Sequence, residues 1–173
     1  YQLGGRGRPD PQPVLEAAHR RALDEARAAE PGRRPTVLVG KSMGGRIACH
    51  IANDSHVEAV IAFGYPLFGQ GDRSKSRDAV LRALQVPIAF VVGDRDPLCP
   101  IADLMALRDE MSAPSTLIVV PAADHALEPK KRPLLALGTS LPEVEGEILA
   151  ALTVFLAAPD HRATLTVPSP IPR

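Results

Sequence analysis

Short runs of apolar, largely β-branched residues recur along the chain, and each is followed by a longer segment that mixes apolar and charged residues. Such continuous apolar runs are typical of strands buried on both faces of a parallel sheet. We predict strands at 36–39, 57–63, 87–92 and 116–120, and helices at 14–29, 46–53, 76–84, 101–111 and 142–157. The alternation predicts an α/β protein with three layers, α/β/α, around a mostly parallel, doubly wound sheet.

The pattern predicts one domain over residues 1–158 and a separate tail over 159–173. The end of the tail is rich in proline, which favours an extended chain over a helix or a central strand. The 173 residues are enough to bury a hydrophobic core. Because the chain starts at Tyr1 rather than at methionine, we expect it to be the carboxyl-terminal portion of a longer domain.

Composition narrows the classes of partner. Twenty basic residues balance twenty acidic ones, so the charge favours neither a nucleic acid nor an anionic membrane. No apolar stretch approaches the ~20 residues of a membrane span. Cys49 and Cys99 lack the spacing of a metal site, and we expect free thiols in a cytoplasmic protein, with a disulfide as the alternative. We therefore expect no metal and no cofactor, and the oligomeric state stays open.

A candidate nucleophile lies between the first predicted strand and the helix after it. Residues 40–44, Gly-Lys-Ser-Met-Gly, match the pattern G-x-S-x-G, which places Ser42 on a sharp strand-to-helix turn. We expect both glycines of the motif to remove side chains that would collide there, and the Met43 N–H to be an oxyanion donor. A chance match is the alternative. A phosphate-binding loop is excluded, because Pro35 stands where that motif needs glycine.

A serine nucleophile needs a general base and a carboxylate that orients it. Asp96 and His125 each follow a later predicted strand, so we expect both at the carboxyl edge of the sheet, beside Ser42. Asp94 is an alternative acid in the same loop. We expect Asp124, next to the histidine, to be an exposed loop carboxylate.

Three segments carry a resemblance to known proteins: Gly-Lys-Ser-Met-Gly-Gly-Arg-Ile-Ala at 40–48, Gly-Tyr-Pro-Leu at 64–67 and Gly-Asp-Arg-Asp-Pro at 93–97. The chain resembles the α/β-hydrolase superfamily from about residue 9 to 156. It is similar to a small branch near the dienelactone hydrolases, which includes testis-expressed hydrolase-like proteins and the hydrolase-like domain of a subunit of the NSL histone acetyltransferase complex. The resemblance implies the α/β-hydrolase fold, and its G-x-x-D acid loop favours Asp96 over Asp94.

Ser42, His125 and Asp96 together predict a serine hydrolase that cleaves an acyl bond, that of a carboxylic ester, thioester or lactone, and the resemblance does not supply the substrate. A non-catalytic scaffold or interaction module with the same fold is the alternative. The candidates for contact with a small acyl substrate are Lys41, Tyr65, Leu67 and Leu98, and Lys41 could attract an anionic substrate. The loop over residues 64–75 is too short for a large cap, which predicts an open site for small or flexible substrates.

The front of the chain departs from the resemblance. These hydrolases have further strands before the helix that precedes the nucleophile, and a loop in that region supplies the second oxyanion donor. We expect neither these further strands nor that loop in this chain. Loss of one donor costs about 10²–10³ in rate, and a missing neighbouring strand leaves an apolar edge open to self-association.

Overall fold

The computed structural model describes residues 9–30, 32, 35–129, 131–158 and 163–167. In this part of the chain, five strands form one sheet in the order β1-β2-β3-β4-β5, and every neighbouring pair is parallel. The strands are β1 (Val37–Lys41), β2 (Ala59–Phe63), β3 (Ile88–Gly93), β4 (Ser115–Val120) and β5 (Ala163–Thr166). The helices are α1 (Gln12–Ala29), α2 (Met43–Ala52), α3 (Ala79–Arg82), α4 (Ile101–Glu110), α5 (Lys131–Ala136) and α6 (Leu141–Ala157).

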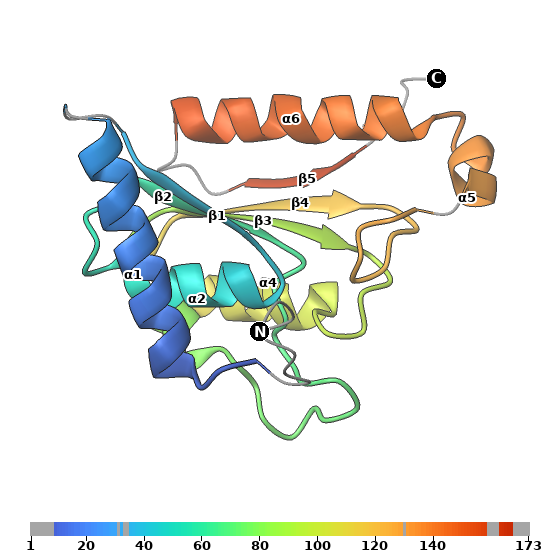
Figure 1. The fold of residues 1–173 in the computed structure, drawn as a ribbon. Helices are drawn as coiled ribbons and strands as arrows, with labels where there is room; N and C mark the ends of the chain where they lie inside the picture. The colour runs from blue at the N-terminus through green and yellow to red at the C-terminus, as the bar shows by residue number, and fades with distance from the viewer. Residues whose placement is uncertain (1–8, 31, 33–34, 130, 159–162, 168–173) are drawn as a thin grey trace.

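Helices cover both faces of the sheet. Figure 1 shows α1, α2 and α4 on one side and α6 on the other. Successive strand residues point to opposite faces, so Val60 and Phe90 join the core under α2 and α4, whereas Ile61 and Val91 join the core under α6. The predicted three-layer α/β/α architecture is confirmed, and β2, β3 and β4 are buried on both faces as predicted. β1, at one edge of the described sheet, is not buried on both faces, because Val39 is 62% exposed. Its parallel strands all end at one edge, where the predicted site residues follow them.

Two short helices differ from the sequence prediction. The helix predicted over 76–84 is only the single turn α3. Before it, Arg77 is bound to the loop after β2, where its N–H donates to the Leu67 carbonyl and its carbonyl accepts from the Tyr65 hydroxyl. Conversely, α5 lies between the predicted strand 116–120 and the predicted helix 142–157, where the sequence indicated no helix. Pro133 fits its first turn, where backbone N–H groups have no intrahelical partner. No helix of the described ranges is both long and apolar enough to cross a membrane.

The predicted tail contains a strand. Residues 163–166, expected to lie outside the domain, form β5 and pair in parallel with β4, and Val167 is buried beyond it. The expectation of a separate tail is wrong here, because the Thr-Leu-Thr sequence carries β-branched residues that suit an edge strand. The rest of the predicted tail, residues 159–162 and 168–173, lies outside the described residues.

A buried arginine holds β5 in place. Arg108 of α4 is 7% exposed, and its guanidinium donates to the Ser115 hydroxyl and carbonyl, to the Ala163 carbonyl and to the Thr164 hydroxyl over 2.6–2.9 Å. We expect Arg108→Met to lower the free energy of unfolding by about 2–3 kcal/mol, because these acceptors lose a charged donor in a buried setting. Urea denaturation measures this change.

The control is Arg21→Met on α1, since the Arg21 side chain is 75% exposed and lies 3.9 Å from the exposed carboxylate of Glu25. An exposed ion pair of this kind contributes at most about 0.5 kcal/mol. Equal stabilities of the two variants would show that Arg108 does not anchor β5.

Candidate active site

Ser42 lies between β1 and α2 in a strained backbone conformation. Its φ of 51° and ψ of −117° fall in a region that residues with a side chain rarely adopt. The Ser42 N–H donates to the Phe63 carbonyl at the end of β2 (2.8 Å), and its carbonyl accepts from the Arg46 N–H in α2 (3.1 Å). The predicted strained strand-turn-helix geometry is therefore confirmed.

Only one glycine of the G-x-S-x-G motif is needed for space inside the turn. A Cβ atom at Gly40 would overlap the backbone of Gly44 and Gly45, which confirms the expectation for Gly40. A Cβ at Gly44 would have no described atom within 4 Å, so the expected collision there is wrong. The close approach occurs one residue later, where a Cβ at Gly45 would lie 2.9 Å from the Gly40 carbonyl oxygen.

Three predicted residues come together at the carboxyl edge of the sheet. His125 Nε2 lies 2.9 Å from Ser42 Oγ, and His125 Nδ1 lies 2.8 Å from Asp96 Oδ2. The other carboxylate oxygen of Asp96 accepts the Leu98 N–H at 2.8 Å. The Asp96 side chain is fully buried and that of His125 is 26% exposed, so the charge is shielded while the imidazole reaches the surface. Asp94, the alternative acid, is exposed.

The loop that carries His125 is shaped by a hydrogen bond of its own and lies close to Gly64 at the end of β2. Asp124 is exposed as predicted, but its carboxylate also accepts the Ala126 N–H at 2.9 Å, a contact that sequence reasoning missed. Aspartate commonly bonds the N–H two residues on, which is the signal that could have found it. Gly64 itself has φ +57°, and a Cβ there would lie 3.0 Å from the His125 carbonyl oxygen and 3.5 Å from its ring. A side chain at Gly64 would therefore be strained by the positive φ and crowd the His125 carbonyl oxygen, while touching the imidazole at an ordinary contact distance.

The four predicted substrate contacts separate into two groups. Tyr65 is fully buried with its ring perpendicular to that of Phe90, and Leu67 is also buried, so both are core residues rather than walls of an open site. Burial raises the pKa of Tyr65, whose hydroxyl donates to a backbone carbonyl. Leu98 is partly exposed next to Asp96. The ammonium of exposed Lys41 donates to the Ala126 carbonyl at 2.8 Å.

Cys49 and Cys99 are free and buried, which confirms free thiols over a disulfide. Burial raises the pKa of both thiols to about 12. Since the thiolate is the reactive form, neither cysteine is a competing nucleophile near neutral pH. In the described ranges, no three His, Cys, Asp or Glu side chains converge into a metal-binding group.

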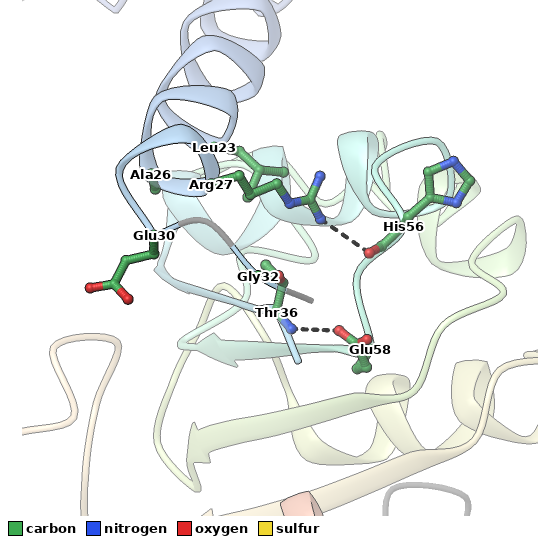
Figure 2. A pocket seen from close by; sticks show the side chains of 8 residues that line it. All are labelled: Leu23, Ala26, Arg27, Glu30, Gly32, Thr36, His56 and Glu58. Atoms are coloured by element: carbon green, nitrogen blue, oxygen red, sulfur yellow. Dashed lines mark hydrogen bonds between the residues drawn. The ribbon is translucent and has the colours of Figure 1, made fainter. Parts of the chain in front are cut away.

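A pocket of about 530 Å³ lies at the opposite edge of the sheet, near the end of α1 and before β1 and β2 (Figure 2). Its charged groups are engaged within the protein. Arg27 donates to the carbonyls of Ser55 and His56, and Glu58 accepts the Thr36 N–H. Figure 2 shows the imidazole of His56 turned away from these groups. The pocket therefore lies between segments that these hydrogen bonds join to one another. It shares no residue with the site at Ser42.

The chain belongs to the family described as the alpha/beta hydrolase domain, whose model matches residues 1–152. Solved structures share the fold at low identity. A monoacylglycerol lipase from Paleococcus ferrophilus superposes with a TM-score of 0.60 at 13% identity, covering 86% of this chain and 76% of the lipase.

Two further structures are similar over a shorter part of their length. A serine hydrolase homologue from Coxiella burnetii has a TM-score of 0.57 at 23% identity, covering 69% of this chain and 54% of that protein. A serine hydrolase without lid from Xanthomonas campestris has a TM-score of 0.55 at 20% identity, covering 70% and 52%. The match thus takes in about half the length of these two proteins.

Proposed function

We propose that this chain is a serine hydrolase that cleaves the acyl bond of a carboxylic ester, thioester or lactone. The observation that supports it best is the chain of hydrogen bonds from Ser42 Oγ through the His125 imidazole to the buried Asp96 carboxylate. Membership of the α/β-hydrolase family agrees with this chemistry. As part of the same proposal, we place the chain in the small branch near the dienelactone hydrolases that its sequence resembles.

In the acylation step, His125 Nε2 takes the Ser42 proton as Ser42 Oγ attacks the acyl carbon. The carbonyl π electrons move to oxygen and form a tetrahedral oxyanion. We assign the Met43 N–H as a donor to this oxygen, because Met43 is the first residue of α2 and the first N–H groups of a helix lack intrahelical partners. Asp96 stabilises the imidazolium. His125 then gives the proton to the leaving group as its bond to the acyl carbon breaks.

In the deacylation step, His125 takes a proton from water as the water oxygen attacks the Ser42 ester. The second tetrahedral intermediate collapses, the proton returns to Ser42 Oγ and the carboxylic acid leaves. The histidine therefore acts as base and acid in turn, which requires that Asp96 keep the Nδ1 of His125 protonated throughout.

The surroundings of Ser42 favour small or flexible substrates. The connection between β2 and α3 holds one isolated bridge, between Gly69 and Asp72, and no helix in its described residues, so it offers no large cap. Of the predicted contacts, Leu98 remains a candidate wall residue. Two free buried thiols agree with a reducing compartment such as the cytoplasm.

A fluorophosphonate probe tests the proposal, because it reacts with a serine only when a base has activated it. We expect one label per folded chain on Ser42, and hydrolysis of short acyl esters by the same preparation. Ser42→Ala is the control and should show neither, while its thermal unfolding stays close to that of the unchanged protein. A folded protein that neither labels nor hydrolyses any ester, thioester or lactone would overturn the proposal in favour of a scaffold.

A further inference from the structure

One contact joins the nucleophile's strand directly to the loop of the base. Lys41 is the last residue of β1 and immediately precedes Ser42. Its Nζ donates to the carbonyl of Ala126, which immediately follows His125, at 2.8 Å and across 85 residues of sequence. Neither group belongs to the reacting atoms, but the contact spans the same gap as the hydrogen bond between Ser42 and His125.

The residue after His125, Ala126, is held at two points of its backbone. The N–H of Ala126 is bound by the Asp124 carboxylate from within the loop, and its carbonyl is bound by Lys41 from β1. The next residue, Leu127, has a φ of 61°, so the chain turns sharply just after the contact. The first contact shapes the loop, whereas the second sets its distance from Ser42.

We propose that Lys41 is a positioning residue that keeps the His125 loop against the nucleophile's turn. This inference rests on the proposed hydrolase function and gives Lys41 a role other than attraction of an anionic substrate. Proton transfer requires that His125 Nε2 stay within hydrogen-bond reach of Ser42 Oγ. A tether between the neighbours of both residues limits their relative motion, which reduces the fraction of time spent out of reach.

The test separates positioning from recognition of substrate charge. We expect Lys41→Met to lower kcat by about three- to tenfold, the range that corresponds to one net hydrogen bond. The fall should be equal for a neutral ester and for an anionic ester of the same acyl chain, with KM unchanged for both. Lys41→Arg should restore most of kcat, because guanidinium N–H groups can donate to the same carbonyl.

The matched control is Lys75→Met, since Lys75 is an exposed lysine in the loop after β2. It should leave kcat and KM at the values of the unchanged protein. If Lys41→Met raises KM for the anionic ester alone, Lys41 recognises substrate charge and the inference fails. It also fails if Lys41→Met and Lys75→Met behave alike.

A second measurement does not depend on catalysis. Hydrogen–deuterium exchange should be faster over residues 121–129 in Lys41→Met than in Lys75→Met, with the peptides of β2 and β3 unchanged. If the unchanged protein has no activity but this difference is found, the hydrolase proposal fails while the tether stands. If exchange over 121–129 is the same in both variants, the tether itself is overturned.

Discussion

Asp96→Asn is expected to lower kcat by about 10⁴-fold, the cost of losing the acid's charge in a triad of this type. The contacts of this carboxylate explain why. One oxygen accepts the Leu98 N–H and the other faces His125 Nδ1. If the asparagine oxygen keeps the Leu98 contact, its NH₂ group faces Nδ1, which must then lose its proton. The remaining proton sits on Nε2, and His125 can no longer act as a base toward Ser42.

Asp94→Asn is the matched control, because it makes the same chemical change two residues away at an exposed position. We expect its kcat to stay within about twofold of the unchanged protein, in line with the small effects of surface substitutions. Steady-state hydrolysis of one activated ester by both variants is sufficient. A large loss in Asp94→Asn together with an active Asp96→Asn would reverse the assignment of the acid.

Much of the architecture was predictable, because burial on both faces leaves a clear pattern in the sequence. The apolar runs that became β2, β3 and β4 carry it, and the order of strand ends predicted that Ser42, Asp96 and His125 would share one edge. β5 was missed because it is a partly exposed edge strand. It depends on Arg108, a contact from α4 made 55 residues earlier in the chain, which no local pattern reveals.

The residues around the candidate triad were harder to predict, because their roles depend on where backbone atoms lie. Tyr65 and Leu67 follow a strand at the correct edge, yet both are buried in the core. Lys41 has the charge expected of an anion contact, but its ammonium binds the carbonyl of Ala126. Sequence order places a residue at an edge of the sheet, whereas the direction of its side chain depends on tertiary packing.

Gly40→Ala should both destabilise the fold and abolish activity. Its Cβ would overlap the backbone of Gly44 and Gly45, and backbone at the start of a helix cannot move aside as a flexible side chain can. We expect the free energy of unfolding to fall by about 3 kcal/mol, at the upper end of the usual cost of overpacking. Any folded fraction should have lost the geometry of Ser42, so fluorophosphonate labelling at saturating probe should fall with activity.

The contrast with Gly44→Ala makes this prediction specific. The second motif glycine lies within α2 with open space around its position, so alanine there should stabilise the helix by about 0.5–1 kcal/mol. Urea denaturation of both variants decides the matter. If Gly44→Ala lowers the free energy of unfolding as much as Gly40→Ala, the motif requires both glycines for packing. Other atoms then lie closer to position 44 than they do in this structure. If both variants are as stable as the unchanged protein, the close approach at Gly40 is not present in solution.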